Sequence, residues 1–95
     1  MGKRSVERKL RKTSTTLKRL RDELIVIDEQ LAHLIDDTED KSLRAMVAES
    51  PGAAVEHREA KGHSEAMAEH RRHVIAEIGN LETQQDKLLD ELRLL

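Results

Sequence analysis

The chain has no phenylalanine, tyrosine or tryptophan, the side chains that normally supply much of the buried area of a globular core. It also has no cysteine, which excludes disulfides and thiolate chemistry. Its only proline, Pro51, lies near the middle of the 95 residues. Charged residues make up 38% of the sequence. This composition, rich in Ala, Leu, Glu, Arg and Lys, is typical of a coiled coil or an extended helical bundle in one domain.

Long apolar runs are missing too, and none approaches the roughly 20 residues that a membrane-spanning helix needs. The basic N-terminal segment lacks the apolar core of a secretory signal. We therefore expect a cytoplasmic protein that does not bind membranes. Intrinsic disorder is the alternative for so polar a chain, but regular apolar stripes over residues 16–35 and 67–95 argue against it.

Apolar residues recur in steps of mostly three and four in each half of the chain, which gives each half one apolar stripe on a helix. The first stripe contains Leu10, Leu17, Leu20, Leu24, Ile27, Leu31 and Leu34. The second stripe contains Met67, Val74, Ile78, Leu81, Leu88, Leu92 and Leu95. We call the apolar contact that these two stripes would make the seam.

The two stripes agree on one antiparallel register. Residues that face each other have numbers with a constant sum, and this sum is 101 or 102 for Leu10–Leu92, Leu24–Ile78, Leu20–Leu81, Ile27–Val74 and Leu34–Met67. The register places the turn near Ser50, a good N-cap, and Pro51, which suits the first helical position. Arg71 and Gln85 fall in the seam, where polar residues commonly fix register.

We predict an all-α fold, a long antiparallel two-helix hairpin (coiled coil), as a single domain over residues 1–95. The first helix should span about 5–49, the turn 50–52 and the second helix about 53–94. A parallel dimeric coiled coil with a kink at Pro51 is the alternative. Residues 36–40 could break the first helix, but we expect it to continue.

The half of the hairpin near the turn has an irregular pattern. Between residues 36 and 64 the seven-residue lines carry small or polar side chains. Five larger apolar residues lie at or near this stretch but off these lines: Ile35, Leu43, Met46, Val47 and Val55. We therefore expect this half to be looser than the other, or to pack on something else.

A two-helix hairpin has one seam and no third layer, and one narrow seam is not expected to offset the entropy of ordering the chain. Residues 24–27 and 74–75 widen the apolar face beyond a single stripe. We expect two hairpins to form a homodimeric four-helix bundle, or one hairpin to dock on another protein's helices. The predicted partner interface consists of Leu24, Ile25, Ile27, Leu31, Val74, Ile75 and Ile78.

Charge is unevenly distributed along the chain. Residues 1–21 hold nine basic residues and one acid, whereas residues 22–59 hold eleven acids and three basic residues. The basic patch consists of Arg4, Arg8, Lys9, Arg11 and Lys12. It could bind nucleic acid or an acidic partner, or its charge could be matched inside the hairpin, with Arg11 and Lys12 near Asp90 and Glu91 and Lys18 near Glu82. No aromatic side chain is present to stack on bases, which makes nucleic acid the second choice.

Five histidines raise the question of a metal site, because bundle metals are held by His and Glu on facing helices. The sequence has no recurring Glu-x-x-His pair and no His-Glu-x-x-His, and Glu69 with His73 is a single i, i+4 pair. A narrow hairpin also offers no shaped pocket for nucleophilic catalysis. We expect no metal site, no cofactor and no enzymatic activity.

The second helix, rich in Arg, Ala, Glu and His, and the hairpin layout resemble small actinobacterial helical-hairpin anti-sigma regulators. Their ligand motif is Glu-x3-Ser-x2-Arg-x3-Gln-x3-Asp, and the corresponding positions here are Glu65, Glu69, Arg72, Ala76 and Asn80. Only Glu65 and Arg72 match, so the resemblance does not imply cyclic-dinucleotide binding. It implies a stoichiometric regulator that sequesters or recruits a partner.

These observations together predict a non-enzymatic protein–protein interaction module, a small bacterial regulatory protein with an anti-sigma or transcription-associated adaptor role. The alternatives are a nucleic-acid-binding dimer that uses the basic N-terminal arm, and a structural coiled-coil assembly protein.

Overall fold

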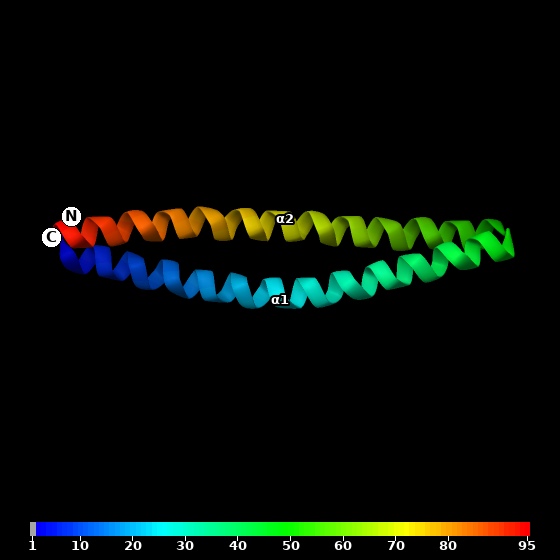
Figure 1. Cartoon of the computed structure of the whole chain (residues 1–95), viewed down its shortest axis with the longest axis horizontal. Coiled ribbons are helices and arrows are strands. Elements are labelled where there is room, and N and C mark those ends of the chain that lie inside the picture. The colour runs from blue at the N-terminus through cyan, green and yellow to red at the C-terminus, as the bar shows by residue number, and fades with distance from the viewer. Residues whose placement is uncertain (1) are drawn as a thin grey trace. The chain divides into compact units, whose positions relative to one another are not determined.

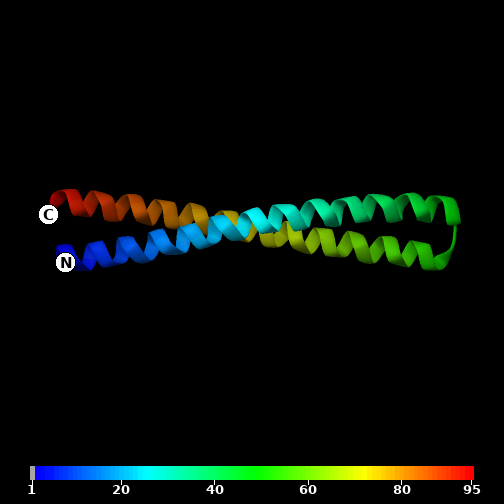
Figure 2. The same cartoon turned by 90° about the horizontal axis from the view of Figure 1, so that it is seen from below.

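The computed structural model describes residues 2–95, and it contains two helices, α1 (Lys3–Ala48) and α2 (Pro51–Leu94). The helices run antiparallel and form the predicted hairpin, with no strand in residues 2–95 (Figures 1 and 2). α1 continues without a break through the acidic residues 36–40, as expected. The prediction of an all-α helical hairpin is confirmed.

The connection between the helices is shorter than predicted and consists of Glu49 and Ser50. The Ala53 N–H donates to Ser50 Oγ at 3.2 Å, which confirms Ser50 as the N-cap and places Pro51 at the first helical position. Because Ser50 is the N-cap, α2 begins at the next residue, Pro51, which is two residues before the predicted start. Glu49 adopts φ 49°, the left-handed conformation with which many helices end.

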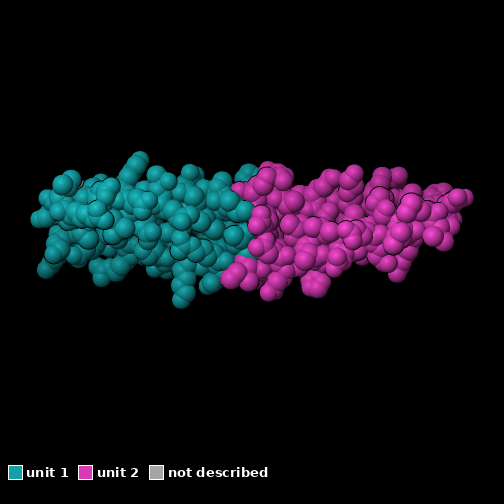
Figure 3. Space-filling view, viewed as in Figure 1, with its two compact units in different colours: residues 1–24, 73–95 teal, residues 25–72 magenta. Residues whose placement is uncertain are grey.

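The packing divides the chain into two compact units (Figure 3). Unit 1 consists of the residues up to Leu24 together with His73–Leu95, and unit 2 consists of Ile25–Arg72. Each unit therefore contains one stretch of α1 and one antiparallel stretch of α2, and unit 2 contains the connection.

Polar contacts between the helices agree with the predicted register in each unit. In unit 1, Gln85 Nε2 donates to Ser14 Oγ at 3.0 Å, and Arg21 pairs with Glu82 at 3.4 Å. In unit 2, Arg71 Nε donates to Asp28 Oδ1 at 2.6 Å. The residue numbers of these pairs add to 99–103, a range that brackets the predicted 101 and 102. Gln85 and Arg71, the predicted polar seam positions, thus each hold a partner on the other helix.

The buried core is distributed unequally between the units. The buried hydrophobic residues of unit 1 are Val6, Leu17, Leu20, Val74, Ile78 and Leu88. Those of unit 2 are Ile27 and Ala60 among the described residues. Unit 2, which contains the connection, thus buries fewer hydrophobic side chains than unit 1, and the prediction that it is looser or packs on something else stays a prediction.

Candidate protein-binding surfaces

The predicted partner interface is split by burial. Ile27, Val74 and Ile78 are buried within the hairpin, and Ile27 is only 3% exposed. Leu24 and Leu31 are half-buried. The two remaining residues of the set are the ones most accessible to a partner: Ile25, which is 60% exposed, and Ile75. The seven residues belong to both units: Ile25, Ile27 and Leu31 lie in unit 2, and Leu24, Val74, Ile75 and Ile78 lie in unit 1.

Helical periodicity explains the split. Ile27 continues the seven-residue line of Leu20, which is also buried, and so it faces α2. Ile25 stands two residues earlier, which rotates its side chain by about 200° away from that line at 100° per residue. Two apolar residues only two positions apart thus belong to different surfaces: Ile27 packs in the seam, and Ile25 lies on the outside of α1.

Unit 2 carries further apolar side chains on the outside of α1, in two lines. Ile25 and Met46 are separated by three seven-residue repeats and so share one line. Val26 and Val47 are related in the same way and form a second line. All four side chains are more than half exposed. α1 in unit 2 is therefore apolar on the seam side and also away from it, a pattern expected of a helix covered on more than one side.

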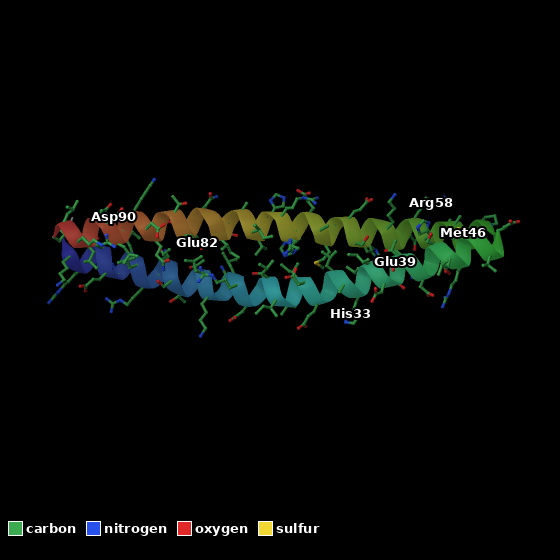
Figure 4. All side chains as sticks on the ribbon, in the orientation of Figure 1. His33, Glu39, Met46, Arg58, Glu82 and Asp90 are labelled. Carbon is green, nitrogen blue, oxygen red and sulfur yellow. The ribbon has the colours of Figure 1, made fainter. Side chains whose placement is uncertain are left out.

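The last turns of α1 concentrate this exposed apolar area at what we call the tip surface, formed by Leu43, Met46 and Val47. Their side chains are 60%, 65% and 85% exposed, and Met46 lies near the connection between the helices (Figure 4). Spacings of three and four residues place them on one stripe of the helix. No segment of described unit 2 covers them, because the seam of α1 lies elsewhere on the helix.

An open groove of about 660 Å³ adjoins the tip surface. Leu43, Val47 and Ala48 contribute apolar walls from α1, and Ala53 contributes from the first turn of α2. The remaining lining residues are polar, charged or glycine: Asp40, Arg44, Ser50, Gly52 and Glu56. A small residue at position 53 leaves room between the helix ends, so the groove could accept an apolar side chain from a partner.

The charges beside this groove are mostly acidic. Arg44 is engaged by Asp40 at 3.2 Å, and Lys41 is engaged by Asp37 at 3.1 Å, each within one turn of α1. Glu56 lines the groove and is exposed. The two cations of α1 beside the groove, Lys41 and Arg44, are thus already paired with carboxylates, and this side of the site favours a ligand that is apolar with basic flanks.

Sequence reasoning did not name the tip surface as an interface, although it noted the signal. Leu43, Met46 and Val47 stand off the seven-residue lines, so they could not belong to the seam. Large apolar side chains that are excluded from a seam must lie exposed or be covered by something else. Counting such residues separately from the seam would have located the tip surface.

The basic patch lies on the outside of α1 in unit 1. Arg4, Arg8, Arg11 and Lys12 are exposed, and none of them forms an ion pair with another residue of the described chain. The intramolecular matching expected for Lys18 with Glu82 does not occur, because Glu82 pairs with Arg21. Asp90 pairs with Arg93 at 3.9 Å. Lys9 and Lys12 also line a groove of about 450 Å³ together with Lys87 of α2.

The histidines are dispersed. His33 lies on the side of α1 that faces away from α2 (Figure 4), and four of the five histidines are exposed. Within residues 2–95 no three His, Cys, Asp or Glu side chains gather in a way that could hold a metal ion. Neither helix, over its described length, is apolar enough along a sufficient stretch to cross a bilayer.

Comparisons with protein-family models, with curated proteins and with solved structures gave no match to this chain.

Proposed function

We propose that this hairpin is a non-enzymatic protein–protein interaction module, and that it binds helices of a partner through the apolar side chains outside the seam. The observation that carries the proposal is the tip surface, where three large apolar side chains are each at least 60% exposed beside an open groove. Exposed apolar clusters with a polar rim are typical of protein interaction sites. Ile25, the exposed member of the predicted interface that belongs to unit 2, would extend the contact along α1.

The biological role proposed for such a module is regulation by stoichiometric binding, as in an anti-sigma protein or a transcription-associated adaptor. The resemblance to actinobacterial helical-hairpin regulators supports this role. Docking of a partner helix into a groove needs anchor residues at helical spacing, and Leu43, Met46 and Val47 provide such a spacing.

Photo-crosslinking in the native host tests the docking proposal. A photoreactive residue is placed at position 47, and a matched control carries it at Glu65, an exposed residue of α2 in the same unit. We expect position 47 to capture a protein that position 65 does not capture. The additional substitution Leu43→Asp should abolish the product without loss of helicity, because Leu43 lies outside the seam. Equal capture from both positions would refute the proposal.

A second function, nucleic-acid binding, is favoured by the exposed Arg4, Arg8, Arg11 and Lys12, which lack ion-pair partners among the described residues. Phosphate contacts by such residues would give an affinity that falls steeply with salt. A gel-shift assay of duplex DNA and of RNA over a salt series tests this function. Binding that is lost in Arg8→Glu/Arg11→Glu/Lys12→Glu would support it, and no shift at low salt would exclude it.

A further inference from the structure

The two units of the chain carry opposite net charge. Unit 1 has eleven basic and eight acidic residues, a net charge of +3 with histidine neutral. Unit 2 has six basic and eleven acidic residues, a net charge of −5. The whole-chain value of −2 conceals this division. Unit 1 of a second copy of the chain therefore has a net charge complementary to that of the acidic unit 2.

Unit 1 also offers apolar side chains outside its seam. Ile75 and Leu89 are two seven-residue repeats apart, so they share one line of α2, and both are exposed. Leu94 and Leu95 add exposed apolar area at the end of α2. Each unit thus combines an exposed apolar surface with a net charge opposite to that of the other.

The exposed area is large enough for a stable interface between copies. The chain exposes 7073 Å², and the roughly 800 Å² per partner that a standard interface buries would cover about a ninth of it. A second hairpin could cover that area and would also supply the layer that a single seam lacks.

We infer that the partner seated on the acidic, apolar surface of unit 2 is unit 1 of a second copy of this chain. This inference rests on the proposed docking function and names its occupant. In a two-fold symmetric dimer this contact would be reciprocal, with unit 2 of the second copy receiving unit 1 of the first. Pairing of like units would instead place −5 against −5 and +3 against +3, and so is disfavoured by repulsion.

Two charge-reversal variants test this pairing. The basic variant, Arg8→Glu/Arg11→Glu/Lys12→Glu, changes unit 1 from +3 to −3. The acidic variant, Asp36→Lys/Glu39→Lys/Glu56→Lys, changes unit 2 from −5 to +1. All six side chains are exposed, and none forms an ion pair within the described chain, so circular dichroism should show unchanged helicity.

Sedimentation equilibrium between about 1 and 100 µM gives the readout. We expect the wild type to be a dimer, each variant alone to dimerise at least tenfold more weakly, and an equimolar mixture of the two to recover dimers of wild-type affinity. The acidic variant alone distinguishes the two arrangements: if like units paired, changing unit 2 from −5 to +1 would relieve repulsion and strengthen the dimer, whereas unlike pairing predicts that the dimer weakens. Raising NaCl from 50 to 500 mM should weaken the wild-type dimer several-fold.

A wild type that stays monomeric at 100 µM would overturn the inference, and so would a mixture that dimerises no better than the separate variants. A monomeric wild type that still forms the position-47 crosslink to another protein would overturn only the second-copy occupant and leave the docking function standing. A monomer without that crosslink would overturn both.

Discussion

Unit 1 and unit 2 are built from the same two helices, but they place their apolar side chains differently. Unit 1 buries six hydrophobic side chains in its seam, whereas unit 2, within the described chain, buries Ile27 and Ala60. Unit 2 instead carries seven of the eleven large hydrophobic residues that are exposed in residues 2–95. A continuous helix can therefore close a hairpin along one part of its length and present a binding surface along another.

The largest expected difference between the units comes from replacing a buried leucine of unit 1 and an exposed leucine of unit 2. Leu17→Ala in unit 1 should lower the unfolding free energy by about 2–5 kcal/mol, because Leu17 is 1% exposed and the change leaves a cavity in the seam. Leu43→Ala in unit 2 should cost less than about 0.5 kcal/mol, because Leu43 is 60% exposed. Urea unfolding at low micromolar concentration measures both. Equal costs would show that the Leu43 side chain is buried in solution, which would contradict the exposed tip surface.

Helix capping tests whether the connection contributes to the stability of unit 2. Ser50→Ala removes the acceptor of the Ala53 N–H and should cost about 1 kcal/mol. The control is Ser64→Ala, where the hydroxyl donates only to the Lys61 carbonyl within α2, at 2.9 Å. Alanine is the better helix former, so this control should be neutral or slightly stabilising. Thermal unfolding followed by circular dichroism separates the two, and a neutral Ser50→Ala would contradict the capping role.

One glycine in α2 of each unit provides a matched pair of substitutions. A Cβ atom added at Gly62 in unit 2 or at Gly79 in unit 1 would meet nothing within 4 Å. Each replacement by alanine should therefore raise the unfolding free energy by about 0.5–1 kcal/mol through helix propensity alone. A destabilising Gly62→Ala would show that a close contact forms at that position in solution, for example with a second copy.

The smallest expected effects belong to the ion pairs that join the helices. The side chains of Arg21–Glu82 in unit 1 and Arg71–Asp28 in unit 2 are 39–54% exposed. Such pairs contribute about 0.2–1 kcal/mol in double-mutant cycles and weaken with salt. We expect similar coupling energies in the two units. A coupling above 2 kcal/mol in either unit would show that ion pairing, and not apolar packing, distinguishes it.

The sequence was sufficient to predict the hairpin, its register and the location of its turn, because apolar periodicity and N-cap chemistry can be recognised in the sequence, but the predicted turn of 50–52 was one residue too long and began one residue late. The irregular pattern of residues 36–64 also agrees with the smaller number of buried hydrophobic side chains in unit 2. Thr13 shows a limit of this reasoning. It lies on the line of Val6 and Leu20 and is 5% exposed, but a count of apolar residues overlooks a threonine.

The candidate interface was only partly predictable. Ile25 and Ile27 look equivalent as neighbouring apolar residues, and only the orientation of α1 toward α2 decides that Ile27 is buried and Ile25 exposed. Long charged side chains are another case, since Arg21 pairs with Glu82 where Lys18 was expected. Residue numbers give the register of two helices, but the reach and rotamer of each side chain decide its partner.

Hydrogen exchange tests most directly the claim that unit 2 has an unfilled seam and depends on a docked partner. At low micromolar concentration, the amides of residues 36–60 should exchange faster than those of residues 6–24 and 74–92, because local opening costs less where few apolar side chains are buried. Raising the protein concentration should slow exchange in residues 36–60 as a second copy docks. Equal protection of both units at low concentration, with no response to concentration, would contradict the account.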